Sequence, residues 1–379
     1  MKRDELFFQL LRYSIGTSDE FPQVTTNDEW NAIYSLAAMH SLSGVVFHGI
    51  HKSGVKPPFE LLMQWVGESE ILRNRNEMAN KTVVKVSQFF EKRGFRGCIL
   101  KGQGNTLNYP EPYVRACGDI DIWLEGGREK IMKMVDERWP GSLARYHHVE
   151  IPEVDGIPVE VHFTPSFSRS PWKNKRLQKW FGEQAEKQFA NQVTLPGTDQ
   201  KICIPTSEFN VIFQLQHMFG HLFTEGFGLR QVVDYYYVLM SDGRRKMDDV
   251  SETLRYLGLW KFACGMMWVM REVLNLNERQ MIAEPDEKEG RFILSEIMQS
   301  GNMGHYDTRL GKTNSEGIVH RYFRMTIRNV RFVRHYPEEA LCEPLFRTWC
   351  FFRRQWQKFI SLCTHRKIRC KLSILTSCV

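Results

Sequence analysis

The chain has 379 residues, of which 42% are hydrophobic, 12% aromatic and 25% charged. This composition excludes disordered and fibrous proteins, and the length predicts two or three units of ordinary domain size. No apolar run approaches the roughly 20 residues that a membrane-spanning helix needs. The net charge of +7 is concentrated at the C-terminus, where 13 Lys/Arg and three Asp/Glu occur from Arg321 onward. A basic surface there could bind nucleic acid or an anionic membrane, although a simply solvated surface is commoner.

Two features of the sequence predict a cytoplasmic location. The nine cysteines are scattered without C-x-x-C spacing, and their odd number favours reduced thiols over a disulfide framework. The N-terminal stretch MKRDELFFQLLRY has an apolar patch, but Asp4, Glu5 and Gln9 interrupt it and no small-residue cleavage site follows. We therefore interpret it as an amphipathic helix and not as a signal peptide.

Residues 1 to about 95 carry helical spacing. In the segment 28–50, apolar residues recur at intervals of three and four after an Asn/Asp start signal. The segment 68–95 predicts a long helix with a polar face that ends near Gly94. We expect a helical N-terminal region over residues 1–95.

The pattern changes at about residue 96. The order that follows is a short strand at 97–100, a Gly-rich turn at 101–105, an alternating strand at 119–124, a helix at 127–139, and two strands at 145–151 and 158–165 joined by a tight turn. The two last strands predict an antiparallel hairpin. Residues 96–166 are therefore expected to form a compact unit of strands and helices.

Residues 167–379 are predicted to be mainly helical, apart from a short β-prone run at 200–205. The segment 207–240 has Ser207 as its expected N-cap and a break around Gly226 and Gly228. Near the C-terminus, apolar residues follow one another at intervals of four and three, namely Leu345, Trp349, Phe352, Trp356, Phe359 and Cys363. This stripe predicts a helix that faces the core more often than one that binds a membrane.

The strand at 119–124 carries two carboxylates among apolar residues. Side chains at i and i+2 of a strand point to one face, so Asp119 and Asp121 project together while Ile120 and Ile122 point to the other. Two carboxylates this close raise each other's pKa unless a cation lies between them. Mg²⁺ prefers a few carboxylate oxygens together with water and phosphate oxygens, so the pair suits a phosphoryl-transfer enzyme.

A third acid is available on the last predicted strand, where Glu160 and His162 share one face. Two acids on one strand and one on a neighbour can hold two metal ions about 4 Å apart, which stabilise the attacking and the leaving oxygens of an in-line displacement. We expect His162 to orient the carboxylate of Glu160 and to face the substrate.

The turn before this strand could contact phosphates. Gly102 and Gly104 follow a strand that ends at Leu100, and a helix is expected from about Asn105, so free backbone N–H groups would face an anion there. Lys101 and Arg115 could add positive charge against a triphosphate. The expected nucleotide-binding residues are therefore Lys101, Gly102, Gln103, Gly104 and Arg115.

Two further pairs lie on predicted helices. His217 and His221 have the i, i+4 spacing of zinc-binding imidazoles, but Met218 stands where a metalloprotease has glutamate, so a structural or substrate-facing role is favoured. Arg230 and Asp234 lie one turn apart and predict an ion pair within their helix.

The stretch LKGQGNTLNYPEPYVRACGDIDIWL at 100–124, followed by VEVHF at 159–163, resembles the bacterial nucleotidyltransferase-like family of the DNA polymerase β-like nucleotidyltransferase superfamily. Members carry a Leu-Lys-Gly turn, a Tyr-Pro, an Arg, an Asp-Ile-Asp and a later acid-x-His strand. The resemblance implies an α+β fold in which a nucleotidyltransferase palm with a mixed sheet, residues 96–166, is flanked by helical regions at 1–95 and 167–379.

The resemblance also implies roles for individual residues. It assigns Asp119, Asp121 and Glu160 as catalytic acids and metal ligands, and it places Gly102 and Gly104 in the loop that faces the triphosphate. The usual Gly-Gly or Gly-Ser turn of the superfamily is here Lys101-Gly102-Gln103, so no serine hydroxyl meets the phosphates.

The implied activity is transfer of a nucleoside monophosphate from a nucleoside triphosphate such as ATP to an acceptor hydroxyl, with release of pyrophosphate and with two Mg²⁺ ions, or Mn²⁺, as cofactors. The acceptor stays open among a small molecule, a glycan precursor, a protein and RNA. Two alternatives remain. The altered turn is compatible with a nucleotide-binding or regulatory module without turnover, and the basic C-terminal helices are compatible with a nucleic-acid-binding protein.

Overall fold

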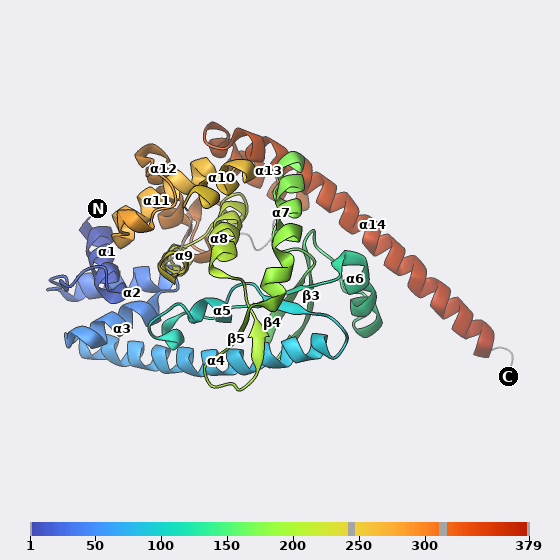
Figure 1. Cartoon of the computed structure of the whole chain (residues 1–379), viewed down its shortest axis with the longest axis horizontal. Coiled ribbons are helices and arrows are strands. Elements are labelled where there is room, and N and C mark those ends of the chain that lie inside the picture. The colour runs from blue at the N-terminus through green and yellow to red at the C-terminus, as the bar shows by residue number, and fades with distance from the viewer. Residues whose placement is uncertain (1, 242–246, 311–316, 377–379) are drawn as a thin grey trace.

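A mixed β-sheet lies at the centre of the structure (Figure 1). The computed structural model describes residues 2–241, 247–310 and 317–376. Within these residues six strands pair in the order β3-β4-β2-β1-β6-β5. Their bounds are β1 Gly97–Ile99, β2 Ile120–Leu124, β3 His148–Val154, β4 Ile157–His162, β5 Gln192–Thr194 and β6 Lys201–Cys203. The α+β fold class predicted from the sequence is confirmed.

The strand pairings explain how the sheet becomes mixed. β2 runs antiparallel to β1 and parallel to β4, while β3 and β4 form the predicted antiparallel hairpin. Asp155 and Gly156 join β3 to β4, both with positive φ angles of 51° and 74°, as a tight two-residue hairpin turn requires. β6 pairs parallel with β1, so the short run predicted at 200–205 extends the same sheet beyond residue 166.

Helices cover both faces of the sheet. The helices before and within the palm are α1 Lys2–Ile15, α2 Asn27–Met39, α3 Ser43–Ser53, α4 Phe59–Glu91, α5 Gln103–Thr106 and α6 Gly127–Arg138. Those that follow are α7 Pro171–Ala190, α8 Ser207–Leu222, α9 Leu229–Ser241, α10 Met247–Leu257, α11 Trp260–Leu274, α12 Glu287–Ser300, α13 Ile318–Val330 and α14 Pro337–Thr376. The break predicted around Gly226 and Gly228 is the junction between α8 and α9.

The two faces of the sheet differ in what they bury. On one face Ile120 and Ile122 join Val159 and Val161 in an apolar cluster with side chains of α4 and α6. Asp121 therefore points to the opposite face, where Trp123 packs against Phe189 at 4.6 Å between ring centroids. The predicted alternation of β2 is confirmed, and it places the acidic side chains beneath the C-terminal helices.

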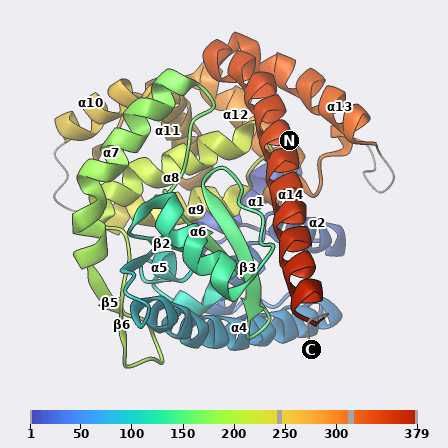
Figure 2. The same ribbon diagram turned by 90° about the vertical axis from the view of Figure 1, so that its right-hand side faces the viewer.

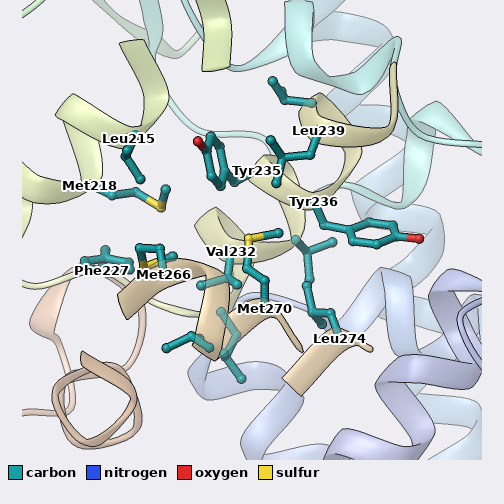
Figure 3. Close-up of a cluster of buried hydrophobic side chains, with 14 of the residues drawn as sticks. Leu215, Met218, Phe227, Val232, Tyr235, Tyr236, Leu239, Met266, Met270 and Leu274 are labelled. Atoms are coloured by element: carbon teal, nitrogen blue, oxygen red, sulfur yellow. The ribbon is translucent and has the colours of Figure 1, made fainter. Parts of the chain in front are cut away.

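The N-terminal and C-terminal helices share one apolar core. Side chains of α1 and α2, such as Leu10 and Ile33, belong to the same buried cluster as the residues of α8, α9 and α11 that Figure 3 draws, among them Met218, Val232 and Met270. At its edge Asn275 donates a hydrogen bond to the carbonyl of Thr17, at 3.0 Å. The helical regions on either side of the palm therefore pack into one body around it (Figure 1).

Helix starts follow local capping chemistry. Thr26 caps α2 in a capping box with Glu29. For α8 the predicted cap, Ser207, is wrong by one residue, because the hydroxyl of Thr206 accepts the hydrogen bond from the backbone N–H of Phe209. Thr206 has the extended backbone of an N-cap, whereas Ser207 is already helical.

The apolar stripe predicted on α14 does not face the core. Its members with described side chains are all exposed: Leu345 (73%), Trp349 (48%), Phe352 (66%) and Trp356 (64%). The side chains of Phe359 and Cys363 lie outside the described ones. The covered side of α14 is polar instead, since Glu339 and Glu343 are buried and Glu339 accepts a hydrogen bond from the backbone N–H of Arg169, at 3.0 Å. The distal half of α14 projects from the body (Figures 1 and 2).

No helix among the described residues is both long enough and apolar enough to cross a membrane.

Candidate active site

Two of the three predicted acids are direct neighbours in the sheet. Asp121 of β2 and Glu160 of β4 are partners in the parallel register. Asp121 is buried, with 3% of its surface exposed, and Glu160 is partly buried. Asp119 lies one residue before β2 and is exposed. The structure thus brings Asp121 and Glu160 side by side and leaves Asp119 at the rim of the same site.

Two cationic groups of the chain neutralise part of this acidic cluster. The Lys101 ammonium lies 3.1 Å from Asp121 Oδ2. His162 Nε2 lies 2.9 Å from Asp121 Oδ1 and 3.4 Å from Glu160 Oε2. The predicted orienting contact between His162 and Glu160 therefore exists, and it extends to Asp121.

These contacts shift the proton affinities of the cluster. The charge of Asp121, followed by burial, raises the pKa of Asp119. Burial by itself would raise the pKa of both Asp121 and Glu160. For Asp121, the contacts with Lys101 and His162 outweigh burial, so its pKa falls. For Glu160, the hydrogen bond from His162 outweighs burial, so its pKa falls as well. Burial opposes the charged form of His162, yet its hydrogen bonds to the two carboxylates raise its pKa to about 9.

The Gly-rich turn passes directly beside the acids. Gly102 adopts a positive φ of 57°, and a Cβ there would lie 3.4 Å from the carbonyl oxygen of Asp119. Gly104 packs against Ile204, 3.2 Å from where its Cβ would be. The helix expected from about Asn105 is α5, which has only four residues, so it contributes little helix dipole.

Gln103 points away from the acids. Its amide nitrogen donates to Asn80 Oδ1 at 2.6 Å and lies 3.3 Å from Asn76 Oδ1, both on α4. The side chain is buried. Gln103 therefore anchors the turn to α4 through its side chain.

Arg115 forms a closed ion pair with Asp234 of α9. Its Nε and Nη2 atoms lie 2.7 and 2.8 Å from the two carboxylate oxygens, and Tyr109 donates a third hydrogen bond to Asp234 at 2.7 Å. All three side chains are buried. The prediction of an ion pair between Arg230 and Asp234 is therefore wrong. The guanidinium of Arg115 binds both oxygens of Asp234, and Arg230 donates a hydrogen bond to the carbonyl of Ala116, at 3.1 Å.

The acids lie on the wall of a cavity of about 560 Å³ between the sheet and the C-terminal helices. The sheet contributes Asp121 and Glu160, the turn after β1 contributes Lys101, and α8, α9 and α14 close the other sides. Arginines from outside the motif region also line the cavity, namely Arg169, Arg230, Arg353 and Arg354. The sequence singled out only Arg230 among them, and as the partner of Asp234, because the four arginines come from segments that only the fold brings together.

Two of these arginines are shielded from water, Arg169 being buried and Arg230 partly buried. Burial lowers the pKa of Arg169 and of Arg230, because a buried cation lacks the water that would stabilise its charge. Arg169 donates to the carbonyl of Gly220 and Arg230 to that of Ala116. The Nε of Arg230 has no hydrogen-bond partner within the described part of the chain. An anionic ligand in the cavity would compensate both charges.

His217 and His221 face the same cavity. His217 Nε2 lies 3.0 Å from His221 Nε2 and 3.2 Å from the Lys101 ammonium. Burial lowers the pKa of His217 well below its usual value and that of His221 to about 3, so both imidazoles are neutral at pH 7. Their predicted role as substrate-facing side chains stays a prediction.

The acidic cluster has a donor set that a divalent ion could use. One oxygen each from Asp121 and Glu160 and one nitrogen of His162 lie within 4.8 Å of one another. Carboxylate oxygens are the preferred ligands of Mg²⁺, and Mn²⁺ also accepts imidazole. The residues present therefore fit a divalent metal.

Comparisons with known proteins identify the family of the chain. The family model described as "Uncharacterised nucleotidyltransferase" matches residues 26–275. No curated protein matches the chain. Among solved structures, an antigenic nucleotidyltransferase-like protein from Paracoccidioides brasiliensis aligns over 56% of this chain and 96% of its own, at 11% sequence identity and a TM-score of 0.33. Since the family model covers the palm and most of the helices around the cavity, the chain belongs to the uncharacterised nucleotidyltransferase family.

Proposed function

We propose that the protein transfers a nucleoside monophosphate from a nucleoside triphosphate to an acceptor hydroxyl and releases pyrophosphate, within the DNA polymerase β-like superfamily. The observation that carries the proposal is the placement of Asp121 directly opposite Glu160 on parallel strands, with Asp119 two residues earlier at the cavity rim. Three acids at one end of a sheet, facing a cavity with buried arginines, suit two-metal phosphoryl transfer.

Asp119, Asp121 and Glu160 would hold the divalent ions. When bound there, Mg²⁺ or Mn²⁺ would lower the pKa of the attacking hydroxyl and neutralise the charge of the leaving pyrophosphate. His162 holds Asp121 and Glu160 through its Nε2 atom, which fixes the orientation of both carboxylates. Its role in the proposal is to position the acids.

The arginines of the cavity supply the groups for phosphate binding. Arg169 and Arg230 are held by backbone carbonyls and lack a carboxylate partner at ion-pair distance among the described residues. A triphosphate would provide the missing negative charge, and guanidinium groups bind phosphate oxygens in pairs. Lys101 adds a third cation beside Gly102. Arg115, in contrast, is fully used by Asp234, so the proposal gives it no phosphate contact.

The acceptor would enter on the side of α14. There the aromatic rings of Phe167 and Phe346 stack at 5.0 Å between centroids, next to Tyr146. Cys350 and Gln357 line the cavity beyond them. A volume of about 560 Å³ lies in the range of small-molecule sites, and we therefore favour a small acceptor or a single side chain over a long RNA duplex.

A second candidate function is nucleotide binding without turnover. Two cations of the chain, Lys101 and His162, already contact Asp121, which reduces the charge that the cluster offers to a metal. In addition, Gln103 is anchored to α4, so the turn presents no side-chain hydroxyl or amide to a phosphate. This arrangement favours a binding or regulatory module over the enzyme if Lys101 stays on Asp121 when nucleotide binds.

One experiment separates the two candidates. Pyrophosphate release is measured from each nucleoside triphosphate with Mg²⁺ or Mn²⁺ and a cell extract as the source of acceptor, and nucleotide binding is measured in parallel. The wild type is compared with the Asp119→Ala/Asp121→Ala variant and with Asp199→Asn, a control at an exposed acid next to β6.

Release that disappears only in the double variant supports the enzyme, and a labelled nucleotide then identifies the acceptor. Metal-dependent binding without release supports the binding module. If release is the same in the double variant as in the wild type, the acids do not have the proposed role.

A further inference from the structure

Three histidines converge beside the acidic cluster. The rings of His147 and His148 have centroids 4.5 Å apart, and the ring of His162 lies 5.2 Å from each of them. All three line the cavity. They form a compact imidazole cluster for which nucleotidyl transfer, as proposed above, has no use beyond the contact of His162 with the carboxylates.

The backbone fixes this convergence. His148 of β3 and His162 of β4 are direct partners in the antiparallel register, so their side chains share one face. His147 lies just before β3, and its carbonyl accepts the hydrogen bond from the backbone N–H of Phe163, at 2.8 Å. Because His147 is outside the regular strand, its ring reaches the same side as that of His148, although adjacent strand residues normally alternate.

The cluster contains buried ring nitrogens without a hydrogen-bond partner among the described residues. His148 and His162 have only 5% and 2% of their surface exposed. Yet His147 Nδ1, His148 Nε2 and His162 Nδ1 have no hydrogen-bond partner within residues 2–241, 247–310 and 317–376. Buried polar atoms are normally satisfied, since leaving one unpaired costs about 1–3 kcal/mol. Each of the three rings therefore has one unsatisfied nitrogen. In addition, His148 Nδ1 lies 3.2 Å from His147 Nε2, close to the separation of two nitrogen ligands of one ion.

We propose that His147, His148 and His162 bind one transition-metal ion of the Zn²⁺ class, at an imidazole site that adjoins the acids and shares His162 with them. Each ring offers one nitrogen, and one set of three ring nitrogens lies within 4.8 Å. Binding displaces a ring proton of His162, because only a neutral imidazole can be a metal ligand. Bonds of about 2.0–2.1 Å to a tetrahedral ion separate its nitrogen ligands by about 3.4 Å, so small rotations of the rings close the site.

The surroundings of His162 match those of a metal ligand. Its Nε2 is bonded to Asp121 at 2.9 Å, which leaves Nδ1 as the second ring nitrogen. Imidazoles that bind metals commonly donate a hydrogen bond from their other ring nitrogen to a carboxylate, which fixes the orientation of the ring and increases its basicity. Imidazole donors select Zn²⁺, Co²⁺, Ni²⁺ and Cu²⁺ over Mg²⁺, which prefers oxygen. This proposal does not depend on nucleotidyl transfer.

The test uses Co²⁺ as a spectroscopic probe. The full-length chain is stripped with a chelator, and Co²⁺ is titrated in the presence of a large excess of Mg²⁺, which occupies oxygen sites. We expect one Co²⁺ per chain with the strong visible absorption of a low-symmetry four-coordinate site, and displacement of Co²⁺ by Zn²⁺. His147→Ala and His148→Ala should each reduce Co²⁺ affinity at least about tenfold, because even loss of a partner outside the ligand shell costs about 10- to 100-fold.

Two controls make the test specific. His217→Ala removes another cavity histidine, and Asp119→Asn removes a rim acid; both should keep the affinity and the spectrum of the wild type. Near-UV circular dichroism checks that each variant is folded, and His147→Gln replaces His147→Ala if the latter fails. Absence of the Co²⁺ band in the folded wild type would overturn the proposal. An unchanged band in both histidine variants, or displacement of Co²⁺ by Mg²⁺, would do so as well.

Discussion

Two buried charged clusters of this protein lie close to the same cavity but are built differently. Around Asp234, one carboxylate meets one guanidinium in two short hydrogen bonds, and Tyr109 adds a third. Around Asp121, three acids face Lys101 and His162, and one nitrogen of His162 has no partner among the described residues. The first cluster is balanced and closed, whereas the second carries excess negative charge and open ligand positions.

The difference suits a structural role for the first cluster and, under the proposed function, a ligand-binding role for the second. A closed pair stabilises the fold as long as both partners are present, because the cost of burial is compensated inside the pair. An open cluster is unfavourable by itself and gains its missing charge from a ligand. Arg115 illustrates the distinction: from the sequence it is a candidate phosphate ligand, whereas in the structure it belongs to the closed pair that ties α9 to the segment before β2.

The largest expected effect concerns the open cluster. Asp119→Asn should reduce nucleotidyl transfer at least about a hundredfold, because a bound metal contributes several kcal/mol to phosphoryl transfer. It should not lower the free energy of unfolding, since the charge of Asp121 raises the pKa of Asp119 and the substitution removes this repulsion. Steady-state kinetics and denaturant unfolding measure the two effects. Equal losses of activity and stability would mean that Asp119 is structural.

The closed cluster should respond in the opposite way. Asp234→Asn leaves the Arg115 charge buried without its partner and should cost about 3–5 kcal/mol in the free energy of unfolding. The double variant Arg115→Met/Asp234→Leu, which replaces the pair by apolar groups, should recover most of this loss. Denaturant unfolding of the single and double variants tests the prediction. A double variant that is no more stable than the single one would show that the site needs the ion pair itself.

A third buried group predicts a pH dependence. His40 follows α2, its Nδ1 accepts the backbone N–H of Leu229 at 3.3 Å, and burial lowers its pKa to about 4. The unfolded chain, with a usual His pKa of 6.5, binds the proton first as the pH falls. Stability that is fully present above about pH 6.5 is therefore lost towards pH 4, by up to about 3 kcal/mol.

The measurement for His40 is the free energy of unfolding at pH 7.5 and pH 4.5. Between these two pH values, the free energy of unfolding of His40→Asn should fall less than that of the wild type, by most of the roughly 3 kcal/mol assigned to His40. Comparing the two proteins cancels the contributions of the other titrating groups to the pH dependence. Identical pH dependence in both proteins would exclude His40 as the source.

The smallest effect is expected at the surface. Arg96 contacts Glu125 at 2.8 Å and Glu186 at 2.6 Å, but all three side chains are largely solvated. Arg96→Gln should change the unfolding midpoint only slightly, and the change should shrink further at high salt because exposed ion pairs are screened. A loss comparable to that of Asp234→Asn would remove the contrast between exposed and buried pairs.

Local sequence patterns predicted the palm well. Alternation in 119–124 and 158–163 placed Ile120 and Val161 in the core and Asp121 and Glu160 on the other face, as the structure has them. The hairpin at Asp155 and Gly156 and the break between α8 and α9 were also predictable, because turn residues and side-chain periodicity act within a few residues. The same reasoning failed for α14, whose apolar stripe is exposed while its buried side is acidic.

The partners of the polar side chains could not be predicted in this way. Asp234 pairs with Arg115 across 119 positions and not with Arg230 one turn away, and Gln103 is held by α4. Arg169, from the start of α7, reaches the cavity without any motif to mark it. Such contacts depend on how separate elements pack.

The sequence by itself therefore determined the α+β class, the strand faces and the shared face of Asp121 and Glu160, since these follow from residue type and short-range periodicity. Only the tertiary structure decided which charges are closed and which stay open to a ligand. The physical reason is that a charged side chain is defined by its neighbours in space: desolvation, ion pairing and unpartnered atoms arise only when distant segments meet. The cavity arginines and the three converging histidines exist as groups for that reason alone.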